Sequence, residues 1–332
     1  MFADLGFNAY RFSIEWARIE PEEGEFSRAQ LEHYRRMLSF CREHGITPVV
    51  TFHHFTSPRW VAERGGWESS STPDRFARYC EHAAAHLGDL IGVACTINEP
   101  NIVAEIGYEQ GRFAPGLRSA AARDRANHNF VRAHHGAREA IRSVAGEVPV
   151  GLTLAMRDYQ PVEGGENMLD SLRARSEDIF LDGVEEDDFI GVQTYSRERV
   201  GPQGLVGPEE GTELTLMGYE FYPQSLEATI RRATEVAGNL PVLVTESGIG
   251  TNDDSRRIAY VTQALQGVSS CLQDGIDVRG YIYWSALDNF EWALGYEPTF
   301  GLIAVDRETQ KRTPKPSARW LGDIARRAER PA

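Results

Sequence analysis

Two glutamates end strongly apolar segments of the sequence. Glu99 follows VACTIN (93–98), and Glu246 follows LPVLVT (240–245). A charge at the end of a buried strand is costly unless it is hydrogen-bonded, paired or used in a reaction. For either residue alone, helix capping and a buried ion pair are the structural alternatives. If the two carboxyl groups share one pocket, one can protonate a leaving oxygen while the other attacks or stabilises the reacting carbon.

The residues that follow other apolar segments are aromatic or carry hydrogen-bonding groups. Aromatic faces stack on the C–H surfaces of sugars, and Asn, His and carboxylate groups give directional hydrogen bonds to hydroxyls. Together with two carboxylates, this set fits the hydrolysis of a glycosidic bond. Nucleotide chemistry is disfavoured, because the chain has no GxxxxGK[ST] motif and no dinucleotide-binding glycine fingerprint. The residues are His53, His54, Asn98, Tyr195, Trp284, Glu291 and Trp292.

The composition is that of a folded globular protein with an acidic balance. Lys and Arg total 35 against 49 Asp and Glu, which gives a formal net charge of −14. This sign argues against binding to nucleic acid or to an acidic membrane surface. The four cysteines have no CxxC spacing and are predicted to be reduced, mostly buried thiols. Acidic runs such as 185–188 are expected to be solvated turns, and no metal or other cofactor is predicted.

Short apolar or β-branched runs alternate with segments of helical periodicity, which is typical of βα units with parallel strands. No linker divides the chain, so one domain over 1–332 is expected, with the Gly- and Pro-rich stretch 197–219 as a long irregular loop. In a parallel barrel the polar residues at the strand ends would share one pocket. The predicted strands are 9–16, 47–54, 93–100, 148–156, 188–195, 240–248 and 278–289. The predicted helices are 27–44, 73–89, 126–144, 225–237, 255–274 and 316–329.

Several longer motifs occur in order along the chain. They are YRFSIEWARIEP (10–21), TFHHFTSPRWVAERGGW (51–67), TINEP (96–100), VTESGIG (244–250) and YWSALDNFEWALGYEPTFGLIAVD (283–306), followed by KPSARW (315–320). This series resembles glycoside hydrolase family 1, the β-glucosidase and β-galactosidase family of retaining enzymes. The resemblance runs almost from end to end and implies an α/β fold, the (β/α)8 TIM barrel.

The resemblance implies roles for the two glutamates and their neighbours. Glu99 corresponds to the general acid/base and Glu246 to the nucleophile. Asn98 matches the residue that bonds the sugar 2-hydroxyl. Arg11 matches the arginine beside the nucleophile, with a core ion pair as the alternative, and Tyr195 matches the tyrosine that hydrogen-bonds the nucleophile.

The resemblance also implies residues that bind the sugar. His54 corresponds to the sugar-binding histidine and Trp284 to the platform beneath the sugar. Glu291 and Trp292 of NFEW resemble the pair that reads the distal hydroxyls. Other histidines and tryptophans are predicted to be packing residues, namely His53, His134, His135, Trp16, Trp60, Trp67 and Trp320.

Some positions depart from the family pattern. Phe55 stands where a tryptophan commonly follows the sugar-binding histidine, which removes one N–H donor to the sugar. Gln193 and Thr194 replace the usual Asn-Tyr pair, and Ser247 replaces the common Asn after the nucleophile. None of these changes touches a catalytic carboxylate. Glu291 would repel a phosphate dianion, so an unphosphorylated sugar is expected.

The first βα unit of the family has no counterpart in the sequence. Segment 9–16 aligns with the second strand, so seven of the eight barrel strands are expected, in an N-terminally truncated domain. In the family the absent strand ends in a glutamine that bonds the sugar. The strands at 9–16 and 278–289 should then have unpaired edges, and the chain is expected to be weakly active and prone to aggregate.

These observations predict a retaining β-glycosidase that acts by double displacement on terminal β-linked glucose or a related unphosphorylated hexose. One alternative is a carbohydrate-binding or vestigial chain that has lost turnover through truncation. Another is an inverting glycosidase, which needs more widely separated carboxylates. The partner is a glycoside or oligosaccharide, and the oligomeric state is open. Without a secretion signal or an apolar run of about 18 residues, a cytoplasmic protein is the default expectation.

Overall fold

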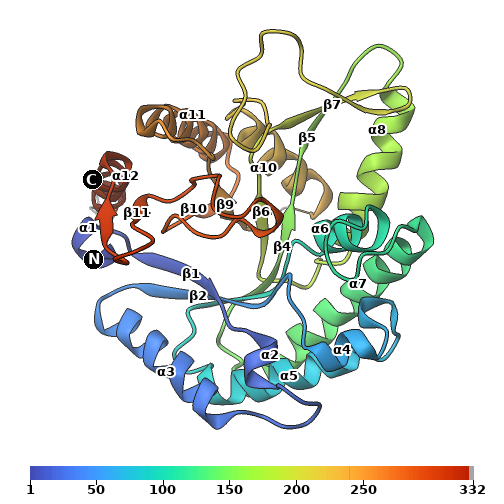
Figure 1. The fold of residues 1–332 in the computed structure, drawn as a ribbon, viewed down its shortest axis with the longest axis vertical. Coiled ribbons are helices and arrows are strands. Elements are labelled where there is room, and N and C mark those ends of the chain that lie inside the picture. Colours follow the sequence, from blue (N-terminus) through green and yellow to red (C-terminus); the bar gives the residue numbers. More distant parts are fainter. Residues whose placement is uncertain (239, 329–332) are drawn as a thin grey trace. The chain divides into compact units, whose positions relative to one another are not determined.

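The main sheet of the protein contains all seven predicted strands. A computed structural model describes residues 1–238 and 240–328 (Figure 1). The strand order is β1-β2-β3-β4-β6-β9-β10. Neighbours pair in parallel from β1 to β4 and between β9 and β10. The strands are β1 (Ala9–Ser13), β2 (Thr47–His54), β3 (Val93–Asn98), β4 (Val150–Ala155), β6 (Phe189–Gln193), β9 (Val242–Ser247) and β10 (Val278–Tyr283).

The six predicted helices are also present. Ser27 caps α3 by accepting from the Gln30 amide, and Gly45 follows that helix with a φ of 68°. The third helix starts before the predicted residue 126, because Ser119 caps it. Residue 329, the predicted end of the last helix, lies outside the described residues. The helices are α3 (Arg28–Glu43), α5 (Thr72–Leu87), α7 (Ala120–Val144), α10 (Ser225–Val236), α11 (Asp254–Gln273) and α12 (Pro316–Ala328).

The contacts divide the described residues into two compact units. The N-terminal unit comprises residues 9–155 and 175–191. The C-terminal unit comprises residues 1–8, 156–174, 192–238 and 240–328. The boundary crosses β6 after Gly191, so the first part of that strand belongs to one unit and the last part to the other.

The N-terminal unit is built from β1 to β4 with α3, α5 and α7 on the outer side of these strands (Figure 1). An aromatic cluster fills part of its core. The Trp16 ring lies 5.3 Å from Tyr79, 5.4 Å from Phe76 and 5.7 Å from Trp60, measured between ring centres. Trp67 lies 6.4 Å away. The prediction that these three tryptophans are packing residues is confirmed, because each is buried.

The C-terminal unit carries two small sheets that were not predicted. The expectation of an irregular loop over 197–219 is wrong for its first part, where two strands form a hairpin around Pro202 and Gln203. A third short strand pairs with this hairpin, and the apolar side chains of Tyr159, Val200 and α8 make a separate core beneath it. The elements are β5 (Asp158–Pro161), β7 (Arg197–Gly201), β8 (Gly204–Val206), α8 (Glu166–Arg173) and the hairpin of β11 (Ile303–Val305) with β12 (Arg312–Pro314).

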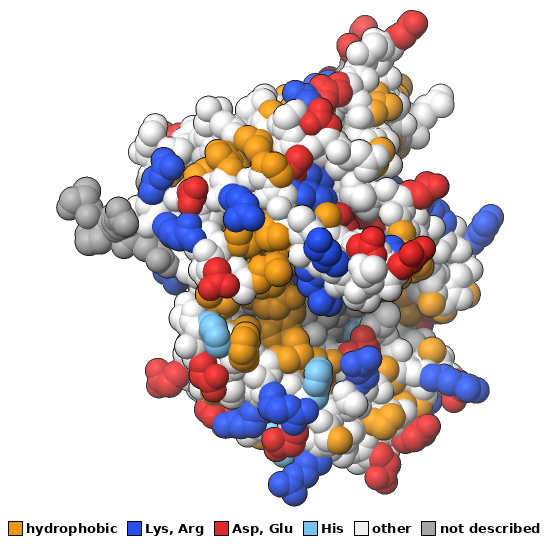
Figure 2. Space-filling view, turned by 60° about the vertical axis from the view of Figure 1, so that its left-hand side comes forward, with side chains coloured by type: hydrophobic (Ala, Val, Ile, Leu, Met, Phe, Trp, Pro, Cys, Tyr) orange, Lys and Arg blue, Asp and Glu red, His pale blue; other side chains and the backbone are white. Residues whose placement is uncertain are grey.

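Short helices fill several loops. They are α1 (Phe2–Leu5), α2 (Trp16–Ile19), α4 (Arg59–Glu63), α6 (Pro100–Ile102), α9 (Ile179–Leu181), the 3₁₀ helices η1 (Gly66–Glu68) and η4 (Trp292–Leu294), and the π-helices η2 (Val103–Glu109) and η3 (Ala174–Asp178). All four cysteines are free and buried, as predicted. Acidic and basic side chains are mixed over the face drawn in Figure 2, so that face presents no field of a single sign.

The two end strands of the main sheet are more exposed than the others. All five residues of β1 are half-buried, and in β10 only Tyr283 is buried. In β3, by contrast, every residue after Val93 is buried. Within the sheet β1 pairs only with β2, and β10 only with β9. Among the described residues the end strands of the sheet are thus the two that the sequence predicts, and the lack of a partner on their outer edges stays a prediction.

Candidate active site

Four of the predicted site residues gather at the strand ends of the N-terminal unit. We call Arg11, His54, Asn98 and Glu99 the N-terminal cluster. The strand register pairs His54 with Asn98, the last residues of β2 and β3. Arg11 Nη2 donates to Asn98 Oδ1 at 2.5 Å. Glu99 follows directly and is 8% exposed, and its amide donates to the Thr153 carbonyl at 2.9 Å.

Two residues that follow strands in this unit have a left-handed backbone. Glu99 has a φ of 44°, and Phe55 has a φ of 68°. Such conformations cost about 1–3 kcal/mol for a residue other than glycine and persist where the surrounding structure imposes them. The Phe55 ring packs 4.9 Å from His54 and 5.7 Å from Phe113. The segment after Glu99 is held by a side-chain hydrogen bond, because Asn101 Nδ2 donates to the Ala155 carbonyl at 2.7 Å.

The two adjacent histidines differ in their surroundings. Burial, the positive charge of Arg11 and the neighbouring His53 hold the pKa of His54 well below its usual range. His54 is therefore neutral at pH 7, with one ring nitrogen to donate and one to accept. Burial lowers the pKa of His53 to about 3. His53 packs against Trp67 at 5.1 Å and hydrogen-bonds Ser57, so the prediction of a packing role is confirmed.

The other predicted residues belong to the C-terminal unit, and we call Tyr195, Glu246, Trp284, Glu291 and Trp292 the C-terminal cluster. Glu246 lies one residue before the end of β9 and is 5% exposed. The Tyr195 hydroxyl donates to Glu246 Oε2 at 2.6 Å, and the Thr194 amide donates to the Glu246 carbonyl.

Tyr195 is itself held in place from two sides. The Tyr260 hydroxyl donates to the Tyr195 carbonyl at 2.7 Å, and the Phe300 ring lies 5.9 Å from the Tyr195 ring. Tyr260 lies in α11 and Phe300 in the segment before β11. Neither residue is predicted from the sequence, because nothing near them in the chain marks the tyrosine that they support.

Trp284 and Glu291 lie beyond the end of β10. The predicted strand 278–289 is too long, because β10 ends at Tyr283 and a cis peptide bond follows Trp284. The Trp284 amide still donates to the Ser247 carbonyl at 3.0 Å. A side chain at Gly248 would place its Cβ 2.1 Å from the Trp284 carbonyl oxygen. Glycine is therefore required there for the two backbones to meet.

Glu291 has an unusual electrostatic environment. Its pKa is raised to about 7, chiefly by burial and further by the negative charge of Glu246, while a hydrogen bond from the Trp284 side chain opposes the rise. Its Oε2 atom is buried without a hydrogen-bond partner in the described structure. A buried, unsatisfied acceptor of this kind is suited to receiving a hydrogen bond from a hydroxyl group.

The structure joins the predicted residues within each unit. Arg11 contacts Asn98 in one cluster, and Tyr195 contacts Glu246 in the other. Glu99 and Glu246 belong to different units, so their joint action as acid/base and nucleophile stays a prediction. The described residues contain no group of three or more His, Cys, Asp and Glu side chains that could hold a metal ion. None of the described helices is both long and apolar enough to span a membrane.

Comparisons with known proteins identify relatives over nearly the whole chain. β-Glucosidase A of Thermotoga maritima is 30% identical over 370 residues, which cover 97% of this chain and 83% of that protein. The crystal structure of the β-glycosidase BGL167 is 52% identical, with a TM-score of 0.94 over 100% of this chain and 85% of that one. The β-glycosidase from Pyrococcus horikoshii is 33% identical, with a TM-score of 0.92 over 98% of this chain and 82% of its own.

These likenesses confirm the predicted fold class, a (β/α)8 barrel of which the described residues form seven strands. The family model described as "Glycosyl hydrolase family 1" matches residues 1–198 and 193–330. Both this match and the relatives point to the same enzyme class. The chain therefore belongs to glycosyl hydrolase family 1 and is a β-glucosidase-like O-glycosyl hydrolase.

Proposed function

We propose that this protein is a retaining β-glycosidase that removes a terminal, unphosphorylated β-linked glucose or related hexose. The observation that carries the proposal is the hydrogen bond from the Tyr195 hydroxyl to Glu246 Oε2 at 2.6 Å. A donor at this distance fixes the direction of the carboxylate, as a nucleophile requires. The names of the relatives support a β-linked glycoside as the substrate class.

In this mechanism Glu246 attacks the anomeric carbon while Glu99 donates a proton to the departing oxygen. A covalent glycosyl-enzyme bond forms as the bond to the aglycone breaks. Glu99 then takes a proton from water, which attacks the anomeric carbon and releases Glu246. Two inversions at the same carbon leave the sugar in its original β configuration.

The remaining residues of the two clusters bind the sugar. Asn98 is oriented by Arg11 and offers its amide to the 2-hydroxyl, and neutral His54 can donate to another hydroxyl. Trp284 supplies an aromatic platform. Glu291 and Trp292 read the distal hydroxyls, and the unsatisfied Oε2 atom of Glu291 supports this role.

The stereochemistry of the first product tests the proposal. Proton NMR during early hydrolysis of an aryl β-glucoside should show the β-anomer of glucose before mutarotation. If the α-anomer appears first, the enzyme uses an inverting mechanism and the proposed retaining mechanism is wrong. Glu246→Gly should abolish hydrolysis, whereas Glu235→Gly, the same substitution at an exposed glutamate, is the matched control and should retain activity. Full activity of Glu246→Gly would remove that residue from the mechanism.

A second candidate function is carbohydrate binding without turnover. The half-buried edge strands β1 and β10 favour it, because a sheet with unpaired edges holds its strand-end residues less rigidly. In this case glucose should bind, as measured by calorimetry, while no hydrolysis of any aryl β-glycoside is detected. Turnover that depends on Glu246 would exclude this candidate.

A further inference from the structure

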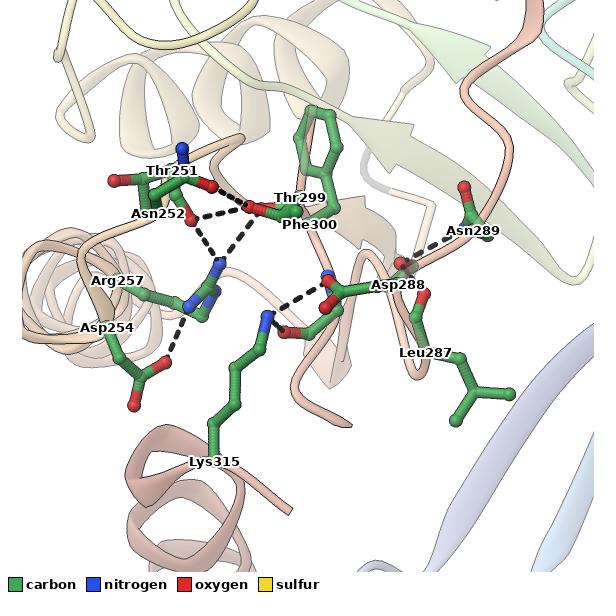
Figure 3. Close-up of polar contacts among 12 residues, drawn as sticks. Thr251, Asn252, Asp254, Arg257, Leu287, Asp288, Asn289, Thr299, Phe300 and Lys315 are labelled. Carbon is green, nitrogen blue, oxygen red and sulfur yellow. Dashed lines mark hydrogen bonds and ion pairs between the residues drawn. The ribbon is translucent and has the colours of Figure 1, made fainter. Parts of the chain in front are cut away.

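A buried arginine in α11 connects three backbone segments of the C-terminal unit. Arg257 is 1% exposed, and its Nε donates to the Tyr283 hydroxyl at 3.0 Å. Its Nη2 donates to the carbonyls of Thr251 and Thr299 at 2.8 and 2.9 Å, and Nη1 pairs with Asp254 (Figure 3). These partners lie just after β9, at the end of β10 and shortly before β11.

A lysine closes the base of the segment between β10 and β11, which we call the 284–302 loop. Lys315 Nζ donates to Asp288 Oδ1 at 2.9 Å and to the Gly301 carbonyl at 2.7 Å (Figure 3). The Gly301 amide donates to the same Asp288 oxygen at 2.8 Å. A Cβ atom at Gly301 would lie 2.1 Å from the Asp288 nitrogen. The two ends of the loop therefore meet at a point where no side chain fits.

The beginning of α12 links these two contacts. The Ser317 amide and hydroxyl donate to Asp254 at 2.8 and 2.7 Å, and Asp254 is the acid that pairs with Arg257. Lys315 and Ser317 both belong to the KPSARW motif, to which the proposed mechanism assigns no role. The motif thus holds the base of a loop whose outer part carries Glu291 and Trp292.

We propose that Lys315 and Arg257 are positioning residues for sugar recognition, because they fix the 284–302 loop and with it Glu291 and Trp292. This inference rests on the proposed function. Without the Lys315 ammonium group, Asp288 loses its cation and the loop base loses two side-chain hydrogen bonds. The bond from the Gly301 amide to Asp288 and the backbone bonds from Leu302 to Ser285 and from Ile303 to Ala286 remain. A displaced loop weakens contacts that are made in both the bound substrate and the transition state, so KM rises while kcat changes little.

The test compares Lys315→Met with Lys311→Met, the same substitution at an exposed lysine. With an aryl β-glucoside, we expect Lys315→Met to raise KM about tenfold, as for the loss of a hydrogen bond to a charged group. Its kcat should fall by less than about threefold. The inhibition constant of glucose should rise by the same factor as KM. Lys311→Met should match the parent protein in all three quantities.

A second measurement does not depend on activity. Phe290 and Tyr296 are exposed on the 284–302 loop and offer cleavage sites for chymotrypsin. We expect the folded Lys315→Met protein to be cut there faster than the parent protein, as followed by mass spectrometry. If Lys315→Met does not fold, Ser317→Ala removes a single hydroxyl and should change KM and cleavage in the same direction, by a smaller factor.

Unchanged KM and unchanged cleavage in a folded variant would overturn the inference. Equal losses of kcat and kcat/KM without faster cleavage would overturn it as well, because they would place the effect in the chemical step. If the parent protein hydrolyses no β-glycoside, the proposed function fails. The cleavage rates then still decide whether Lys315 holds the loop.

Discussion

The N-terminal and C-terminal clusters hold their polar side chains by different means. Arg11, His54 and Asn98 lie within strands, and Glu99 follows β3 directly, so strand register places all four. In the C-terminal cluster only Glu246 lies within a strand.

Tyr195 follows β6, and Trp284, Glu291 and Trp292 lie in the 284–302 loop. Contacts from α11 and from the residue directly before α12 hold this second set, through Tyr260 and Lys315. Backbone pairing therefore fixes one cluster, whereas distant side chains fix the other. Substitutions outside the proposed site should therefore affect the C-terminal cluster more.

The largest effect should come from the N-terminal cluster itself. Glu99→Gln removes the proposed proton donor, so kcat/KM should fall about 10²- to 10⁴-fold for alkyl β-glucosides. Activated aryl glucosides need little protonation and should lose far less. The basic limb of the pH profile should also flatten. Equal losses for all leaving groups, measured by steady-state kinetics, would indicate a binding role for Glu99.

A smaller loss should follow from removing the support of Glu246. Tyr195→Phe deletes a hydrogen bond to a charged group, worth about 1.5–3 kcal/mol, so kcat/KM should fall about 10- to 150-fold. The exposed Tyr296→Phe is the control. An unchanged kcat/KM of Tyr195→Phe, measured by steady-state kinetics, would show that Tyr195 does not support Glu246.

The raised pKa of Glu291 should appear in the pH dependence of stability. Its carboxyl group has a pKa of about 7 in the folded protein against an ordinary value of 4.5. The folded state therefore holds a proton that the unfolded state has already lost between these pH values. Stability falls as pH rises through this window, and the full cost is present above pH 7.

Glu291→Gln removes the titrating group from this buried position. The Tm of the variant minus that of the parent should therefore be larger at pH 8 than at pH 5, as measured by calorimetry. The exposed Glu297→Gln should show no such difference. A Tm difference that does not change with pH would contradict the raised pKa and weaken the contrast between the clusters.

The smallest effect is expected at the edge of the N-terminal unit. The unpaired edge of β1 should allow chains to associate, so the average mass in sedimentation experiments should rise with concentration. Ala9→Lys places a charge in β1 and should reduce association, whereas Asn8→Lys adds the same charge just outside the strand. A monomer at every concentration would show that this edge is protected.

Much of the fold could be predicted because its signals are local. Apolar runs marked all seven strands, and helical periodicity marked the six long helices. The candidate residues could be predicted because they lie at the ends of parallel strands. The strand register then places Asn98 next to His54. The hairpin of β7 and β8 was missed because Gly and Pro in 197–219 indicate turns without showing that the flanking residues pair.

The amino-acid sequence by itself determined which residues can do chemistry and which strands present them, because hydrophobic pattern and side-chain type are properties of short segments. The tertiary structure decided how the C-terminal cluster is held. Arg257 meets Thr299, and Lys315 meets Asp288, across 42 and 27 positions of the chain. The same is true of the pKa of Glu291, which depends on burial and on the charge of Glu246. Such contacts and fields arise only after the strands have brought distant segments together.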